Sequence, residues 1–241
     1  MTALREHLNL FALALHRATV LRVRAQPEDD EDSLRASDAH LPGAGWIIGI
    51  AGCLAFALFG VLMRASGWGA GVASVAATMA IATLTRARGE TALFRTAERL
   101  QAGSAPGASG MGTLVLMLVT AAKLGLLAAV ASLSQPAVLA TIFAAQVTSR
   151  LAPLLLARSL AGDVSPRAVR VGALWCAVPL ALLVPLAGVL SLVLAALAAT
   201  LACYGMWRLA RRQAQPLDRD LLASAQQVCE LAFCVGVAIG L

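Results

Sequence analysis

The residues best suited to chemistry are charged side chains that interrupt long apolar stretches of the sequence. Lys123 lies in the middle of one such stretch, and Glu230 lies inside the last one. A charged side chain at the centre of a bilayer costs at least about 3 kcal/mol, so it faces the interior of a helical bundle or a wet cavity. For Lys123, an ion pair with Glu230 and a contact to substrate are equal alternatives. For Glu230, the alternatives are a functional role and hydrogen bonding between helices.

Polar residues gather at two further places inside apolar stretches. The planar guanidinium of Arg150 suits a phosphate or a carboxylate, and both a phosphate contact and an ion pair stay open for it. The neighbours that make this place polar are Gln146, Thr148 and Ser149. In the last stretch, spacings of three and four residues put polar groups on one face of a helix. These are Gln226, Gln227 and Glu230, with Asp220 at the start of the stretch.

A hydrophilic segment between two apolar stretches holds the carboxylates Glu90 and Glu98. On a helix, a separation of eight residues leaves two side chains within about 80° of each other, so both could approach one divalent ion. Arg95 and Arg99 in the same segment suit phosphates. Charged loops of this kind are common on membrane proteins, and on this segment alone we favour an ordinary charged loop.

The elements that must position these residues are predicted to be membrane-spanning helices in an all-α bundle. The chain has 241 residues, 59% of them hydrophobic and only 13% charged, whereas soluble proteins average about 25% charged residues. Seven apolar runs are long enough to cross a hydrocarbon layer of about 30 Å as helices. They are 42–63, 67–84, 110–133, 136–160, 168–188, 189–207 and 223–241. The turn at 184–188 carries no charge, so six or eight spans are alternatives.

The placement of arginines predicts the orientation, because cytoplasmic loops retain Lys and Arg. Arginines precede the first run and the last run, follow the second and flank the turn after the fourth, and only Arg64 falls on the opposite side. We therefore expect the N-terminus and the segments 85–109 and 208–222 to be cytoplasmic and the C-terminus to be outside. Because basic residues lie at span ends rather than on one face with aromatic residues between them, nucleic acid is not an expected partner.

Two regions of different character make up the predicted chain. Residues 1–40 are expected to form a cytoplasmic segment, and residues 41–241 a single transmembrane domain. Within the first region, apolar residues recur at near-helical spacing with Arg and His between them, which predicts an amphipathic helix on the inner membrane surface. These residues are Leu4, Leu8, Phe11, Leu15 and Leu21. The acidic run 28–32 is expected to be a solvated linker.

Several short motifs follow one another in an order that matches a known family. The head of the first span is similar to a Phe-Pro-x-x-Gly-x-x-x-Gly motif. Its matching residues are Leu41, Pro42, Gly45, Ile47, Ile48 and Gly49. Further matches are the run 113–127 around Lys123, the Ser149 and Arg150 pair, Asp220 with Leu222 and Ala223, and Glu230 with Leu231. Together they resemble adenosylcobinamide-GDP ribazoletransferase, the cobalamin-5′-phosphate synthase family, over nearly the whole chain in matches of two to six residues.

The chain departs from this family at its strongest motif, a cytoplasmic His-Leu-Asp-Gly followed by two more Asp. The motif falls on Arg88, Gly89, Glu90, Thr91, Phe94 and Ala97. Only Glu90 keeps a carboxylate there, although Glu98 lies one residue after the third acidic position, and Gln227 stands where the family has Glu. The loss of two of three carboxylates should weaken binding of a divalent ion greatly.

The resemblance implies a multi-pass transferase of the cell inner membrane. It would join adenosylcobinamide-GDP to α-ribazole or its phosphate and release GMP, with Mg²⁺ neutralising the diphosphate. Implied catalytic residues are Glu90, Asp220 and Glu230, implied substrate contacts are Lys123, Ser149, Arg150 and Arg95, and implied metal ligands are Glu90, Glu98 and Asp220.

Two other functions stay open. One is a non-catalytic scaffold of the corrinoid-assembly pathway, which the missing acids favour. The other is a transporter or permease component, which a composition of seven spans permits. A homo-oligomer and complexes with other corrinoid-pathway proteins are also left open by the sequence.

Overall fold

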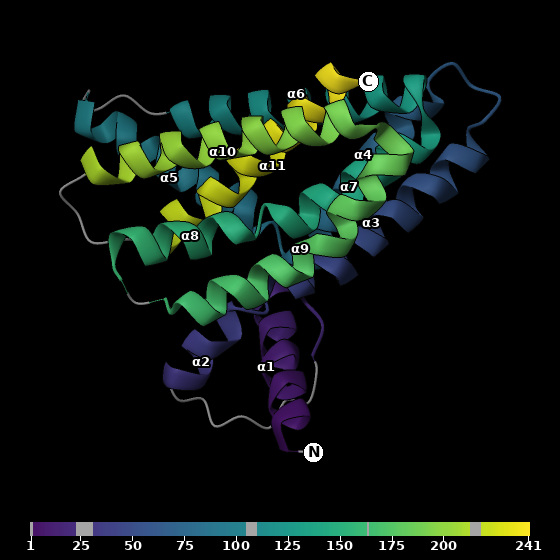
Figure 1. Cartoon of the computed structure of the whole chain (residues 1–241). Coiled ribbons are helices and arrows are strands. Elements are labelled where there is room, and N and C mark those ends of the chain that lie inside the picture. The colour runs from purple at the N-terminus through teal and green to yellow at the C-terminus, as the bar shows by residue number, and fades with distance from the viewer. Residues whose placement is uncertain (1, 23–30, 105–109, 163, 213–217) are drawn as a thin grey trace.

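All regular structure in the part of the chain that is described is helical. The computed structural model describes residues 2–22, 31–104, 110–162, 164–212 and 218–241. Its helices are α1 Thr2–Ala18, α2 Glu31–Asp38, α3 Leu41–Leu62, α4 Gly69–Thr85, α5 Arg88–Ser104, α6 Met111–Leu133, α7 Gln135–Thr148, α8 Leu151–Leu160, α9 Pro166–Ala187, α10 Val189–Arg212 and α11 Arg219–Gly240. In Figure 1, α7 runs between α3 and α9, while α10 and α11 lie side by side. The predicted all-α class is confirmed.

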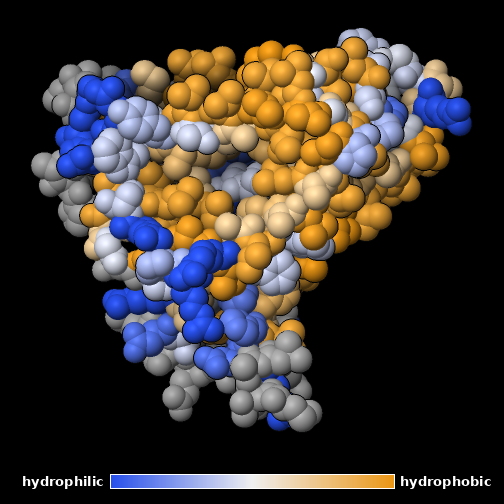
Figure 2. Space-filling view, in the orientation of Figure 1, coloured by the Kyte–Doolittle hydropathy of each residue, from blue (hydrophilic) through white to orange (hydrophobic). Residues whose placement is uncertain are grey.

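Six of these helical segments are long and apolar enough to cross a membrane, and the bent pair α4 and α5 makes a seventh if the two helices together form one span. The six are Leu41–Leu62, Met111–Leu133, Gln135–Leu160, Pro166–Ala187, Val189–Arg212 and Arg219–Gly240. Hydrophobic residues cover most of the body in Figure 2, and hydrophilic ones lie at its ends: near α1 and α2, at the left edge beside the end of α10, and in a smaller group at the upper right. The structure therefore has six or seven candidate spans, a range that includes the predicted seven and the alternative of six.

The segment predicted as a cytoplasmic loop at 85–109 contains a helix. After α4 the chain turns through 85° and continues as α5. The turn is made by Arg86 and Ala87, which have φ values of 57° and 48° although neither is glycine. The left-handed region costs a residue with a Cβ about 1–2 kcal/mol, so surrounding contacts must hold this turn. Helix α5 supplies them, since its Ala92, Leu93 and Ala97 are buried.

The fourth apolar run is broken into α7 and α8 at Ser149 and Arg150 rather than forming one helix. Proline three residues into α8 accounts for the position of the break. The ring of Pro153 has no N–H and would clash with the carbonyl of Ser149 in a continuous helix. That carbonyl instead accepts a hydrogen bond from the backbone N–H of Ala152 at 3.2 Å.

The predicted boundary between the fifth and sixth runs is confirmed. Helix α9 ends at Ala187, α10 begins at Val189, and Gly188 alone joins them. Gly188 has a φ of 91°, a conformation that costs glycine little because it has no Cβ.

The N-terminal region packs on the bundle through α1. Phe11 stacks on Trp175 of α9 with ring centroids 5.4 Å apart, and Leu13, Ala14 and Leu15 are buried. The carboxylate of Asp38 and the hydroxyl of Ser37 on α2 accept hydrogen bonds from Arg17, each at 2.7 Å. Residues 31 and 32 of the predicted linker belong to helix α2, and residues 28–30 of the acidic run lie outside the described residues. The expected position of α1 on the membrane surface stays a prediction.

Candidate active site

The interior of the bundle holds a buried ion pair between Lys123 of α6 and Glu230 of α11. Lys123 is 6% exposed and Glu230 is 1% exposed, so both charges are removed from solvent. The same Glu230 oxygen, Oε1, also accepts a hydrogen bond of 2.5 Å from Nε2 of Gln146 on α7. The alternative of an ion pair, considered for Lys123 from the sequence alone, is thus what the structure shows.

Arg150 joins this network because the break between α7 and α8 leaves a carbonyl of the preceding turn without a helical partner. The guanidinium of Arg150 donates to that carbonyl, on Gln146, and to the side-chain oxygen of Gln146 at 3.0 Å. Arg150 is 4% exposed. Gln146 therefore links the cation at the break between α7 and α8 to the carboxylate of α11.

Glu90 brings a second carboxylate to the same place from the first turn of α5. Its charge attracts both Lys123 and Arg150. Glycine at position 89 permits this approach, because a Cβ there would overlap the side-chain amide of Gln227 on α11. Among the described residues, Oε2 of Glu90 and Oε2 of Glu230 are both buried and have no hydrogen-bond partner. We call Glu90, Lys123, Gln146, Arg150 and Glu230 the buried charged network.

Ser149 lies beside this network but faces a different space. It is 3% exposed, and its hydroxyl has no hydrogen-bond partner among the described residues. Together with Tyr204, Trp207 and Phe233 it lines an apolar cavity of about 500 Å³ between α8, α9, α10 and α11. The face shown in Figure 2 is hollowed in this region.

The other predicted residues form a separate group of surface ion pairs between α5 and α11. Arg99 pairs with Asp218 and also with Asp220 at 3.4 Å, and Arg95 lies 3.9 Å from Asp220. The hydrogen bond from Arg99 lowers the pKa of the Asp218 carboxyl below its usual value. Arg95 was predicted to contact substrate, and Asp220 was predicted to bind metal or take part in catalysis. In the structure both form ion pairs within the chain.

Glu98 has a structural contact of its own. Its Oε1 accepts hydrogen bonds from the backbone N–H groups of Gly110 and Gly112 at 3.1 and 2.7 Å. Free N–H groups at a helix start need such acceptors, so Glu98 caps α6. It does not share a contact with Glu90 in any of the described interactions.

The divalent-ion site implied by the family resemblance does not fit the described residues. No group of three or more His, Cys, Asp or Glu within them is close enough to hold a metal ion. Of the three expected ligands, Glu98 caps α6, Asp220 pairs with arginines, and only Glu90 keeps a buried oxygen without a partner. At the two lost acidic positions, Ala97 is buried and Phe94 lies against the start of α6, where a Cβ on Gly112 would overlap it.

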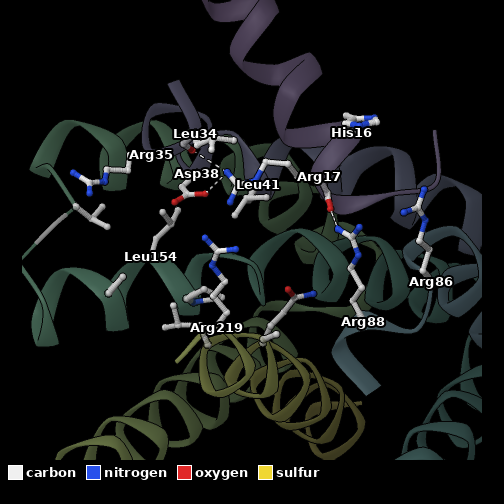
Figure 3. A pocket seen from close by; sticks show the side chains of 16 residues that line it. His16, Arg17, Leu34, Arg35, Asp38, Leu41, Arg86, Arg88, Leu154 and Arg219 are labelled. Carbon is white, nitrogen blue, oxygen red and sulfur yellow. Dashed lines mark hydrogen bonds and ion pairs between the residues drawn. The ribbon is translucent and has the colours of Figure 1, made fainter. Parts of the chain in front are cut away.

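A cavity of about 880 Å³ opens between the N-terminal helices and the ends of α8 and α11. Its charged lining is Arg17, Arg35, Asp38, Arg86, Arg88 and Arg219, and we call it the basic cavity. Figure 3 shows Arg17, Arg88 and Arg219 directed toward the same space. Sequence reasoning missed it because these arginines are far apart along the chain and were all assigned to membrane orientation.

A helical membrane protein with buried cations and a basic cavity is suited to an anionic ligand. Residues 10–238 match the Cobalamin-5-phosphate synthase family, and the chain belongs to that family. It is 30% identical over 244 residues to the adenosylcobinamide-GDP ribazoletransferase of Polaromonas naphthalenivorans, with 86% of this chain and 88% of the relative covered. It is 33% identical over 253 residues to the same enzyme of Albidiferax ferrireducens, with 86% and 88% covered. No solved structure matches the chain.

Proposed function

We propose that this chain is an adenosylcobinamide-GDP ribazoletransferase of the cell inner membrane. The supporting observation is that the family match contains every residue of the buried charged network, and that this network retains two carboxylate oxygens without partners. The substrates would be adenosylcobinamide-GDP and α-ribazole or its phosphate, and GMP would leave.

The reaction exchanges a phosphoanhydride bond for a phosphate ester bond at one phosphorus atom. A hydroxyl oxygen of α-ribazole forms a bond to the phosphorus that carries the cobinamide, and the bond from that phosphorus to the oxygen of GMP breaks. The electron pair stays on the GMP oxygen, and the hydroxyl proton goes to a base. Such a reaction is accelerated mainly by positioning and by neutralising the charge on the phosphate oxygens.

The buried charged network offers groups for both tasks. Glu90 and Glu230 each have an oxygen free to accept the hydroxyl proton. Lys123 and Arg150 are buried cations, and fixed charges in a site of low polarity stabilise developing negative charge more strongly than they would in water. We assign proton acceptance to Glu90 or Glu230 and charge stabilisation to Lys123 and Arg150. No role is assigned to a metal ion, because the described carboxylates do not form a site for one.

The test is a purified-protein assay with adenosylcobinamide-GDP in the presence and absence of α-ribazole. We expect GMP release that requires α-ribazole and equals the formation of cobalamin product. Loss of turnover in Arg150→Gln, with retention in the exposed-site control Arg158→Gln, would assign the activity to the network. A folded wild type that binds substrate and releases no GMP, with or without added Mg²⁺, would contradict the proposal.

A non-catalytic scaffold is the second candidate, and the conversion of two family acids to Phe94 and Ala97 favours it. A scaffold would leave GMP unreleased by the pure protein, yet the protein would co-purify with corrinoid-pathway enzymes. Uptake of a corrinoid into sealed vesicles would instead indicate a transporter.

A further inference from the structure

The basic cavity has no part in the function argued so far, although its charge is strongly unbalanced. Five arginines and one carboxylate line it, and they come from α1, α2, the turn after α4, α5 and α11. These arginines repel one another, because like charges are brought together from five separate elements. A bound anion would offset this electrostatic cost.

The single carboxylate is already committed to one arginine. Asp38 lies 2.7 Å from Arg17, which also donates to the carbonyl of Leu34 at 2.8 Å. Burial raises the pKa of Asp38 above its usual value, and the charges of Arg17 and Arg219 oppose that shift. Arg17 thereby ties α2 to α1 and shapes the cavity wall, while its own charge is neutralised.

Three other arginines supply the excess charge. Arg86 and Arg219 form no ion pair with any residue in the described ranges. Arg88 donates one hydrogen bond to the backbone carbonyl of Arg17. This contact leaves other N–H groups of Arg88 available and does not neutralise its positive charge. The planar fork of an arginine binds phosphate oxygens in pairs, so these three side chains suit a phosphorylated ligand. Arg95 and Arg99 do not, since Asp218 and Asp220 already hold them.

The cavity lies near the buried charged network along two helices, although no residue of the network lines it. On α5, Arg88 lines the cavity and Glu90 belongs to the network two residues later. On α11, Gln226 lines the cavity, and Glu230 follows one turn further, about 6 Å along the helix axis. The cavity also has an apolar wall that includes Leu34, Leu41 and Leu154, which can cover a base or sugar.

We propose that the basic cavity binds the nucleotide half of the substrate, with Arg86, Arg88 and Arg219 on its phosphates. This rests on the proposed function, and it places the leaving GMP in the cavity and the phosphorus under attack toward Glu90. As the bond to GMP breaks, the electron pair stays on an oxygen that these arginines neutralise. Arg17 acts as a positioning residue, because its contacts hold the wall rather than the ligand.

The test measures binding of GDP without turnover. Protein in nanodiscs of zwitterionic lipid is titrated with fluorescent GDP, and unlabelled GDP, GMP, pyrophosphate and guanosine compete. We expect the phosphorylated competitors to displace the probe and guanosine to be at least tenfold weaker. The double variant Arg86→Gln with Arg219→Gln should bind at least about tenfold more weakly, since each charged hydrogen bond lost lowers affinity by about that factor.

The double variant Arg167→Gln with Arg170→Gln is the matched control, because it also removes two positive charges, from exposed positions on α9 that do not line the cavity. It should bind GDP within about twofold of the wild type, and thermal melting of all variants should confirm that they are folded. Affinity of the double variant within twofold of the wild type would overturn the proposal. Guanosine competing as well as GDP would also overturn it.

A lipid headgroup could supply the same phosphate chemistry, so the titration is repeated in nanodiscs of anionic lipid. Retained GDP binding supports a nucleotide ligand. The proposal is overturned if GDP binding is lost and anionic lipid co-purifies with the wild type but not with the double variant. Failure of the proposed function gives a different result: GDP binds through the arginines, but no GMP is released from adenosylcobinamide-GDP. Turnover with an unchanged KM in the double variant would refute only the cavity assignment.

Discussion

Lys123 on α6 and Glu230 on α11 form an ion pair inside the bundle, and each is more than nine-tenths buried. Their attraction offsets the cost of taking two charges out of water. Removing one partner of a buried pair leaves the other charge uncompensated and costs about 3–5 kcal/mol. We expect Glu230→Gln and Lys123→Met each to lower the thermal stability of the protein in detergent clearly.

The double variant Lys123→Met with Glu230→Gln tests whether that loss comes from the pair itself. Its stability should recover much of the loss, since no unpaired charge remains, although Gln146 would keep only a neutral partner at position 230. Two single losses that simply add in the double variant would show that the ion pair is not the cause. Activity is measured on the same variants, and a stable double variant without turnover would separate catalysis from packing.

Close contact between α10 and α11 depends on Gly236. A Cβ at this position would overlap the backbone of Ala195 and the carbonyl of Leu194, neither of which can rotate away. Small residues permit such approach between membrane helices. We expect Gly236→Ala to destabilise the protein by about 1–3 kcal/mol through overpacking. The control is Gly205→Ala on α10, where the added methyl meets open space and should be neutral or slightly stabilising.

The sequence predicted the parts of this structure that depend on composition and on single unusual residues. Apolar runs predicted the spans because a bilayer imposes a minimum length on them. Gly188 marked a helix break that the structure confirms, and the cost of burying Lys123 and Glu230 indicated that the two could pair.

Features that depend on three-dimensional contacts were not predictable in the same way. The left-handed turn at Arg86 and Ala87 is not a sequence preference, since neither is glycine, and it exists because α5 packs back on α6 and α11. The capping by Glu98 joins residues on two helices, and spacing along α5 had suggested a metal ligand instead. The basic cavity brings Arg17, Arg86 and Arg219 together only after α1 docks.

Docking of α1 should weaken at mildly acidic pH because of His40. Phe11 of α1 stacks on Trp175, and Trp175 is hydrogen-bonded to His40. Trp175 donates its indole N–H to Nδ1 of His40 at 3.4 Å, which requires that nitrogen to be unprotonated. Burial, with a further contribution from His7, lowers the pKa of His40 below its usual 6.5. A lowered pKa means that the folded protein resists protonation, so its stability is complete above about pH 6.5 and declines as pH falls toward the folded pKa.

Thermal melting at pH 7.5 and pH 5.5 measures this effect. Tryptophan fluorescence follows unfolding, with Trp175 as one of four contributing tryptophans, and the melting temperature should be lower at the acidic pH. In His40→Gln the difference between the two pH values should shrink, because the titrating group is gone while Asp38 and the other acids are unchanged. An equal pH dependence in both proteins would rule out His40 as its source.

The orientation of the chain in the membrane is predicted from arginine placement and is open to a direct experiment. A reporter fused after Gln101 should read cytoplasmic, and one fused at Leu241 should read external. The reason is that arginines flank the cytoplasmic ends of the spans and Arg64 alone lies opposite. A cytoplasmic reading at Leu241 would mean one span fewer, and the Gln101 reporter locates the difference. An external reading at Gln101 would mean that the bent pair α4 and α5 does not cross, whereas a cytoplasmic reading there would place the missing span later in the chain.

A Glu98→Gln variant can distinguish a structural role of Glu98 from a role in metal binding. Its Oε1 accepts from the N–H groups of Gly110 and Gly112, and the carbonyl oxygen of a glutamine can accept the same two hydrogen bonds. We expect Glu98→Gln to keep nearly all activity and to lose only the charge interaction at the start of α6, about 0.3–1 kcal/mol. Glu98→Ala removes the acceptor as well and should cost about 1 kcal/mol or more.

Turnover of both variants is measured across a range of Mg²⁺ concentrations together with their melting temperatures. Near wild-type turnover in the Gln variant at every Mg²⁺ concentration confirms the cap, whereas a need for much higher Mg²⁺ at unchanged stability would make Glu98 a metal ligand after all.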